Sequence, residues 1–337
     1  MFLMKDIITL NHGAGGRDTN ELIREIFFDA FKNELLTADD AAILPSPNAK
    51  LAFTTDGFIV SPWKFSGGNI GKLSICGTVN DLAAMGAKPL YLSVAFVIEE
   101  GFLTADLKEI ALAMKKTAEE AGVKIVVGDT KVAGKNQAGG VFITTSGIGE
   151  VSENVNLSGK FAKAGDKIII TGDIGRHGAA ILLSRDNFSV SANILSDCAP
   201  LYKIADAALN ASNNIHTIRD ATRGGVGTVL YEIAEASKVG AKLYRENIPI
   251  QGEVKGLTAM LGLEPLYLAC EGRFVIIVGE NDANNVLNAV KSAPYGENAA
   301  IIGEITDEHS GKVVMKTEIG TETFLPAPGG ELLPRIC

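Results

Sequence analysis

Aspartates follow apolar or small-residue segments at five places in the sequence. They are Asp39-Asp40 in TADDAAILP, Asp56 in AFTTDGF, Asp81 in TVNDLAAMGA, Asp129 in IVVGDTKV and Asp220 in IRDATRGG. Carboxylates at strand ends can converge on one face of a sheet, where their like charges repel one another unless a cation is present. Oxygen ligands without His or Cys suit Mg²⁺, which proteins usually bind through one or two carboxylates and substrate phosphates. Aspartates are also common as turn and cap residues, so spacing alone leaves a metal site and a structural role open.

The sequence ends in LPAPGGELLPRIC, so its last residue is Cys337. An exposed free thiol oxidises and cross-links, which makes this position a liability unless the thiol is used. The other cysteines, Cys76, Cys198 and Cys270, form no Cys-x-x-Cys pair, which argues against a structural zinc site and favours a reducing cytoplasm. A prenylation box is excluded as well, because such a box has its cysteine four residues from the end, whereas Cys337 is the last residue.

Glycine-rich stretches are a second feature with chemical potential. Neither NHGAGGR nor SGGNIGKLS fits the Rossmann or P-loop pattern. GRHGAA and TRGGVG each carry an arginine at an expected helix start, where backbone N–H groups can hold a phosphate, although each is also typical of a tight turn. His177 lies in one such loop, and Glu271 precedes an apolar strand; a structural role is the alternative for both.

Composition excludes several classes of function. The chain has 337 residues, which suits about two domains. Its net charge of −9 and the absence of a long Lys/Arg cluster argue against nucleic-acid binding. No apolar run reaches the roughly 18 residues of a spanning helix, and the N-terminus does not resemble a secretory signal.

The hydrophobic pattern predicts alternating strands and helices. A strand is expected over 51–60, interrupted at Asp56-Gly57, followed by a helix with Asn69 as N-cap that ends by Gly86. On that helix Asp81 has small neighbours, which leaves room for a ligand or another backbone. Further helices are expected over 104–121 and directly after Arg223-Gly-Gly. This alternation indicates an α/β or α+β architecture.

Several motifs together resemble a known family over essentially the whole chain. They are NHGAGGR, DDAA, TTDGFIVSPWKFSGGNIGKLSICGTVNDLAAMGAKP, GDTKV, DATRGG and the terminal PRIC. NDLAAMGA and GDT alone indicate only an ATP-binding superfamily that contains aminoimidazole ribonucleotide synthetase, selenophosphate synthetase and thiamine monophosphate kinase. With PRIC, the chain resembles the HypE family of hydrogenase maturation factors.

The resemblance implies an enzyme, a carbamoyl dehydratase. A partner carbamoyltransferase would load a carbamoyl group onto Cys337, and ATP with Mg²⁺ would then phosphorylate the carboxamide oxygen. Loss of phosphate and of the amide protons would leave an S-cyanate. The cyanide would pass to iron on a scaffold complex that serves [NiFe]-hydrogenase.

The same resemblance assigns roles to individual residues. The expected ligands of Mg²⁺ and the nucleotide phosphates are Asp40, Asp56, Asp81, Asp129 and Asp220, with an added oxygen from Thr55. Gly13, Gly15 and Gly16 resemble a mobile loop near the nucleotide. Glu271 is the first choice and His177 the second for the base that deprotonates the carboxamide nitrogen, and Lys131 would stabilise charge on the phosphoryl or carboxamide oxygen.

The implied fold is α/β (α+β) with two domains. Residues 1–39 would be an N-terminal extension, 40–155 an ATP-binding and dimerisation domain, and 156–325 a C-terminal α/β domain. Residues 326–337 would form a mobile tail ending in Cys337. The mixed N-terminal sheet is expected to pair across a homodimer and form a β-barrel.

Two alternatives predict different behaviour of Cys337. A kinase or synthetase of the same superfamily that acts on a free small molecule would keep its turnover without Cys337. A non-catalytic carrier would use the tail only for docking and would not hydrolyse ATP. The number of superfamily aspartate motifs argues against the carrier, and the terminal cysteine argues against the free-substrate kinase.

Overall fold

The N-terminal half is built on a four-stranded sheet. The computed structural model describes residues 6–14, 17–36, 41–185 and 192–327. The strands are β1 (Lys50–Phe58), β4 (Ala87–Glu99), β5 (Lys124–Ala133) and β6 (Val141–Val151). Their order is β1-β6-β4-β5, and only the β4–β5 pair is parallel, so the sheet is mixed as predicted.

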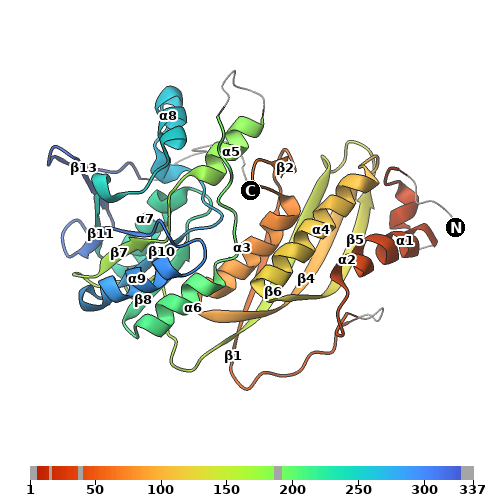
Figure 1. Cartoon of the computed structure of the whole chain (residues 1–337), viewed down its shortest axis with the longest axis horizontal. Coiled ribbons are helices and arrows are strands. Elements are labelled where there is room, and N and C mark those ends of the chain that lie inside the picture. Colours follow the sequence, from red (N-terminus) through yellow and green to blue (C-terminus); the bar gives the residue numbers. More distant parts are fainter. Residues whose placement is uncertain (1–5, 15–16, 37–40, 186–191, 328–337) are drawn as a thin grey trace.

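Helices cover one face of this sheet and one of its edges (Figure 1). The long helices α3 (Ile70–Ala84) and α4 (Thr104–Ala121) pack on the face. Near β5 lie η1 (Leu10–Gly13), α1 (Arg17–Leu22), the π-helical segment η2 (Ile23–Phe28) and α2 (Asp29–Phe31). The short strands β2 (Lys64–Phe65) and β3 (Gly68–Asn69) pair just before α3.

The C-terminal half contains a seven-stranded sheet in the order β13-β12-β9-β11-β7-β10-β8. The strands are β7 (Lys167–Ile170), β8 (Ile215–Asp220), β9 (Gly240–Tyr244), β10 (Phe274–Val278), β11 (Ala300–Thr306), β12 (Val313–Lys316) and β13 (Glu322–Phe324). The helices are α5 (Arg176–Ser184), α6 (Tyr202–Ala211), α7 (Gly225–Ser237), α8 (Gly252–Leu261) and α9 (Ala283–Ser292). Short 3₁₀ turns are η3 (Arg245–Asn247), η4 (Pro265–Tyr267) and η5 (Glu280–Asp282).

Helix α3 joins the two halves and begins where the sequence predicts. The Asn69 side chain accepts a hydrogen bond from the Lys72 N–H at 3.0 Å, which caps the helix. Thirteen of its fifteen residues are buried, because the N-terminal sheet, α4 and the C-terminal half surround it. Its small residues permit this packing: a Cβ on Gly71 would lie 2.4 Å from the Ile110 carbonyl oxygen of α4.

One expectation needs correction, and several others lie outside the described residues or stay predictions. Strand β1 is not interrupted at Asp56-Gly57, because its register with β6 continues to Phe58. Within the described residues β1 and β5 are free edges, so one chain has an open sheet and no closed barrel. Gly15, Gly16, Asp39, Asp40 and residues 328–337 with Cys337 lie outside the described residues. The predicted boundary at 155/156 falls between β6 and β7, and the domain limits stay a prediction. No helix in the described ranges is long and apolar enough to cross a bilayer.

Candidate functional site

Strand β1 and helix α3 place two carboxylates against each other. Alternation along β1 turns Thr54, Asp56 and Phe58 toward α3, and the Thr54 hydroxyl donates to Asp81 Oδ2 at 2.8 Å. Asp56 lies opposite Gly77, where a Cβ would come within 3.5 Å of its Oδ2. The small residues predicted beside Asp81 therefore make room for the Asp56 carboxylate.

The C-terminal half adds two more carboxylates to this region. Asp220 ends β8 and pairs with Phe274 of β10, and Glu271 lies just before β10. Burial, followed by the charges of Asp81 and Asp56, raises the pKa of Asp220 to about 6, although Arg219 opposes the rise. Burial is also the main cause that raises the pKa values of Asp56 and Asp81. Asp56, Asp81, Asp220 and Glu271 are named the acidic cluster below.

Glu271 is the most buried member of the acidic cluster, with 3% of its surface exposed. Burial, then the neighbouring Cys198 and Asp220, raises the pKa of its carboxyl well above the ordinary value. Its backbone is fixed: its N–H donates to Asp197 Oδ1 at 2.9 Å, and its carbonyl accepts from Asn80 Nδ2 at 3.3 Å. No residue in the described parts of the chain donates a hydrogen bond to its carboxylate. Glu271 thus has a fixed backbone and carboxylate oxygens that can still accept a proton, as a general base requires.

Helix α7 starts five residues after Asp220, at the turn formed by TRGGVG. Gly224 and Gly225 adopt positive φ values of 76° and 61°. A Cβ on Gly225 would lie 2.5 Å from the carbonyl oxygens of Leu266 and Leu268. Glycine is required here both for the backbone conformation and for the close approach of the segment that leads to Glu271.

The structure does not bring Asp129, Lys131 and Thr55 to the acidic cluster of the same chain. Asp129 pairs with Ala95 in the β4–β5 register, on the face of the sheet that lacks helices. Its carboxylate accepts from Lys131 Nζ at 2.8 Å, and this hydrogen bond is the main cause of its lowered pKa. Thr55 lies on the same open face and contacts Ser146.

Gly13 lies against Val132 of β5 on the helix-covered side of the sheet, beside an apolar cavity of about 260 Å³. A Cβ on Gly13 would come within 2.8 Å of Val132 Cβ, so the loop needs glycine to rest on β5. The cavity lies between the N-terminal helices and the sheet. Its lining includes Gly13, Phe27, Phe31, Phe96, Asp129 and Lys131. Three residues that the sequence singled out therefore share one cavity.

His177, the second choice for a base, is fully buried on α5. Its Nδ1 lies 2.9 Å from Ser196 Oγ, and its ring packs edge-on against Phe65. These contacts hold the segment that carries Asp197 against the N-terminal half. Any catalytic role of His177 stays a prediction.

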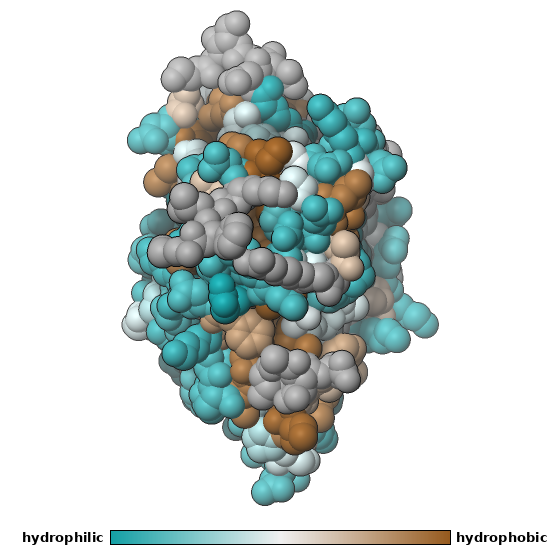
Figure 2. All heavy atoms as spheres, turned by 90° about the vertical axis from the view of Figure 1, so that its right-hand side faces the viewer, coloured by the Kyte–Doolittle hydropathy of each residue, from teal (hydrophilic) through white to brown (hydrophobic). Residues whose placement is uncertain are grey.

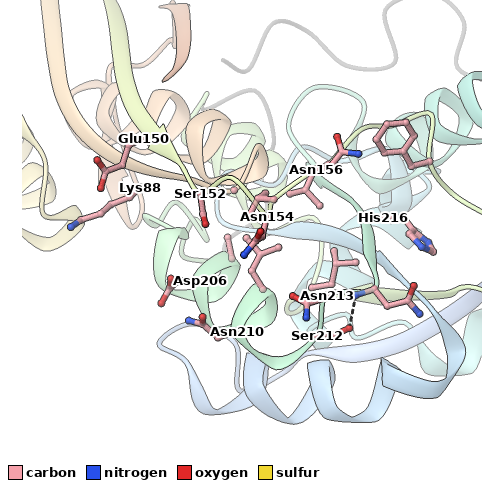
Figure 3. A pocket seen from close by; sticks show the side chains of 18 of the residues that line it. Lys88, Glu150, Ser152, Asn154, Asn156, Asp206, Asn210, Ser212, Asn213 and His216 are labelled. Carbon is pink, nitrogen blue, oxygen red and sulfur yellow. Dashed lines mark hydrogen bonds between the residues drawn. The ribbon is translucent and has the colours of Figure 1, made fainter. Parts of the chain in front are cut away.

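A larger cavity, of about 1050 Å³, lies elsewhere (Figure 3). It follows the seam between β4 and β6, the 152–163 connection and α6. Its labelled side chains are mostly amides and hydroxyls, among them Asn154, Asn156, Asn210 and Asn213. None of the residues predicted for catalysis or nucleotide binding lines it.

Sequence reasoning missed Asn80 and Asp197, which position Glu271. Asn80 also donates to the Ala199 carbonyl at 3.1 Å and accepts from the Leu201 N–H at 2.8 Å. A buried polar residue in a helix of small and apolar residues was an available signal for Asn80. Asp197 carries no comparable signal, because its contact with Glu271 spans 74 positions in the sequence.

The donor chemistry of the acidic cluster suits a divalent cation. Its oxygen atoms are hard ligands. Burial, followed by the charge of Asp81, raises the pKa values of Asp56 and Asp220, and a cation would oppose both effects. Among the described residues, no three His, Cys, Asp or Glu side chains lie close enough to ligate one ion by themselves. Ligation of Mg²⁺ would therefore need further oxygens, such as those of a bound phosphate.

Comparisons with known proteins cover the whole chain. Residues 38–151 match the AIR synthase related protein, N-terminal domain, and residues 163–316 match the AIR synthase related protein, C-terminal domain. A carbamoyl dehydratase HypE from Rhodobacter capsulatus is 43% identical over 341 residues, with 100% of both chains covered.

Solved structures agree with this assignment. The hydrogenase maturation protein HypE in complex with ATP has a TM-score of 0.93 and 40% identity, covering 98% of this chain and 99% of that one. The HypE of a HypE–HypF complex has a TM-score of 0.81 and 46% identity, covering 91% and 99%. The chain therefore belongs to the HypE family of carbamoyl dehydratases.

Proposed function

We propose that the protein uses ATP to dehydrate an S-carboxamide on Cys337 to an S-cyanate, which supplies cyanide to the iron of [NiFe]-hydrogenase. The observation that carries the proposal is the full-length similarity to carbamoyl dehydratases, PRIC terminus included. The acidic cluster at the junction of the two halves supports it, because phosphoryl transfer needs carboxylates that hold Mg²⁺ and phosphate.

The reaction balances without a redox partner. The carboxamide oxygen attacks the γ-phosphorus of ATP, ADP leaves, and one N–H proton is lost to give an O-phosphorylated imidate. The second N–H proton then departs, the C–O bond breaks, and inorganic phosphate carries the oxygen away. The product on sulfur is a nitrile, so one water has been removed and its atoms are in the phosphate and the released protons.

Glu271 is proposed as the base for the nitrogen protons. Its raised pKa makes it a stronger base than an exposed carboxylate, and its free acceptor face can reach a proton. Mg²⁺ bound with the nucleotide would neutralise phosphate charge beside Asp56, Asp81 and Asp220. Lys131 is proposed to stabilise charge on the phosphoryl or carboxamide oxygen.

The nucleotide is proposed to bind between two copies of the chain. The apolar cavity near Gly13 has the size and lining for a base, with Asp129 and Lys131 at its polar rim. Asp129 and Lys131 lie on the open face, whereas the cavity and the acidic cluster lie on the helical face, near opposite edges of the sheet. A second copy with its β5 near β1 would bring its own Asp129 and Lys131 toward Asp56.

The open face supports a homodimer. Phe53 is 70% exposed and Leu51 is 57% exposed, and both lie on β1, which is a free edge of the sheet. On another side of the molecule, near β5 and the N-terminal helices, Figure 2 shows hydrophobic patches that interrupt the hydrophilic surface. Exposed apolar residues beside an unpaired strand edge favour pairing with another sheet. A Phe53→Asp variant is expected to be monomeric in light scattering and to lose ATP-dependent activity.

The remaining partners follow from the proposed reaction. The solved HypE–HypF complex supports a HypF-type carbamoyltransferase as the protein that loads Cys337. An iron-carrying scaffold complex would accept the cyanide. A reducing cytoplasm would keep the Cys337 thiol available.

The test is the intact mass of the C-terminal peptide after incubation with the carbamoyltransferase and its carbamoyl source. Wild-type protein is expected to gain a carbamoyl group on Cys337 and to lose the mass of one water only when MgATP is added. A Cys337→Ala variant is the control for other modified sites. An unmodified Cys337 beside an active partner would overturn the proposal and favour a superfamily kinase that acts on a free small molecule.

A further inference from the structure

The chain before the C-terminal tail is held by two tyrosine hydroxyls. The Tyr231 hydroxyl of α7 donates to the Leu325 carbonyl, and the Tyr267 hydroxyl of η4 donates to the Pro326 carbonyl. The Leu325 N–H donates to the Val313 carbonyl of β12 at 2.9 Å, and the Leu325 side chain is buried in the same apolar cluster as both tyrosines. Three hydrogen bonds and one buried side chain therefore fix two consecutive residues.

These tyrosines lie on elements that continue into the candidate site. The Tyr267 ring packs on Gly227 in the first turn of α7, where a Cβ would lie 2.7 Å from Tyr267 Cε1. Helix α7 begins shortly after Asp220, and Glu271 follows Tyr267 by four residues. The root of the tail is thus attached to the two segments that carry Asp220 and Glu271, although β13 itself lies at the far edge of the sheet (Figure 1).

The hydroxyls are suited to a lasting contact. Both tyrosines are buried, and burial raises the pKa of Tyr267 to about 12, so the phenol stays a hydrogen-bond donor at neutral pH. Pro326 has no N–H, so its carbonyl is the backbone group through which it can be held. Eleven residues follow Pro326, which gives Cys337 a maximum reach of about 36–40 Å from this point.

We propose that Tyr231 and Tyr267 are positioning residues that fix the pivot of the C-terminal arm, and so set the effective concentration of the Cys337 carboxamide at the acidic cluster. The inference rests on the proposed function. A reactive group on a tether reacts as an intramolecular partner, and its effective concentration falls when the tether lengthens or its anchor moves. Release of Leu325 and Pro326 would both lengthen the arm and shift its origin away from Glu271.

The test compares Tyr231→Phe, Tyr267→Phe and the double variant with wild type. Tyr244→Phe is the matched control, because it removes the hydroxyl of a half-buried tyrosine of the same half, which donates to Glu304, without touching the tail. Hydrogen exchange of the Leu325 amide reads the pivot directly. In each of the three variants of Tyr231 and Tyr267, the Leu325 amide is expected to exchange about fivefold faster than in wild type. In Tyr244→Phe it is expected to exchange at the wild-type rate.

Single-turnover dehydration of loaded Cys337 reads the functional effect. The double variant is expected to react about fivefold to tenfold more slowly than wild type. A synthetic S-carbamoyl peptide of residues 328–337, added to Cys337→Ala protein with and without the tyrosine changes, is expected to react at one rate. This second assay separates the pivot from the chemistry.

The outcomes distinguish the two proposals. Unchanged Leu325 exchange in the double variant would overturn the pivot, as would equal slowing of the tethered and the free substrate. If wild-type protein failed to dehydrate either substrate while the variants still raised Leu325 exchange, the proposed function would fail and only the anchoring part of the inference would stand.

Discussion

The two groups of aspartates in the N-terminal sheet have opposite electrostatic environments. Asp56 faces α3, and burial raises its pKa, with a further contribution from Asp81. Asp129 lies three strands away on the open face, is largely exposed, and has its pKa lowered by the hydrogen bond from Lys131. Asp56 and Asp129 therefore lie on the same sheet but are suited to different binding partners.

The difference indicates what each group lacks. The positive side chains near the acidic cluster do not neutralise all of its carboxylates, so the cluster is suited to bind a cation. The Asp129–Lys131 pair is already compensated within the chain and needs little from a ligand for its own stability. A carboxylate on the helical face is therefore buried and uncompensated, whereas one on the open face is exposed and paired with a lysine.

The largest expected effect comes from the most buried carboxyl. Glu271→Gln keeps the size of the side chain and its backbone bonds but removes the basic oxygen. Dehydration of loaded Cys337 is expected to slow by about 100-fold or more, the usual contribution of a general base. Binding of ATP, measured by calorimetry, is expected to change little.

A surface change in the same segment is the control for Glu271→Gln. Glu264→Gln removes an exposed ion pair with Arg245 and is expected to leave the dehydration rate unchanged. Normal dehydration by Glu271→Gln would exclude Glu271 as the base and leave His177 as the candidate to test.

The second effect is on stability, and its sign differs between the two groups. The pKa of Asp220 is about 6 in the folded state against an ordinary value of 3.8. The folded state therefore binds more protons between these values, and the free energy of unfolding falls as pH rises through this window, by about 2–3 kcal/mol. Asp220→Asn is expected to be more stable than wild type at about pH 8 and to lose that advantage near pH 4, in urea unfolding.

Asp129→Asn is expected to behave in the opposite way. Its carboxylate has a lowered pKa, so the stability it contributes is present above the ordinary pKa and is lost as pH falls through the folded pKa. The variant should therefore be slightly less stable than wild type at neutral pH and equal to it in acid. Matching pH profiles for the two variants would contradict the comparison.

The helices that position the site were predictable because their signals are local. Asn69 caps α3, Gly122 ends α4 at a φ of 71°, and α7 starts at Gly225 as TRGGVG predicts. Each of these signals involves residues within a few positions of one another, so one sequence is enough to read them.

The face of β1 was not predictable, because its pattern is inverted. Leu51 and Phe53 point to the open side, whereas Thr54 and Asp56 point to the helices, the reverse of an ordinary half-buried strand. The inversion arises because the inner face carries the acidic cluster. Contacts between distant segments, such as Asn80 with Glu271, also left no local signal, since only the folded chain brings α3 and β10 together.

The third effect is stabilisation by Mg²⁺, which should depend on pH. Mg²⁺ alone is expected to raise the melting temperature by about 2 °C at pH 8 and by less near pH 5, where Asp220 is protonated. Asp220→Asn should lose most of this rise in melting temperature. Asp129→Asn should keep it, because Asp129 does not belong to the acidic cluster of its own chain. A response that is equal at both pH values would argue against the acidic cluster as the cation site.

The smallest effect tests the two faces at adjacent positions of β1. Thr54→Val removes the hydroxyl that donates to Asp81, and Thr55→Val removes one that contacts Ser146 on the open face, while both keep a β-branched side chain. Loss of the Thr54 hydrogen bond should raise the pKa of Asp81 further, since that bond opposes the effect of burial. Binding of MgATP, measured by calorimetry near pH 7, should weaken about fivefold in Thr54→Val and about twofold or less in Thr55→Val. A larger loss in Thr55→Val would mean that the threonine on the open face supplies the ligand oxygen, and the metal would then belong with Asp129 rather than with Asp56 and Asp81.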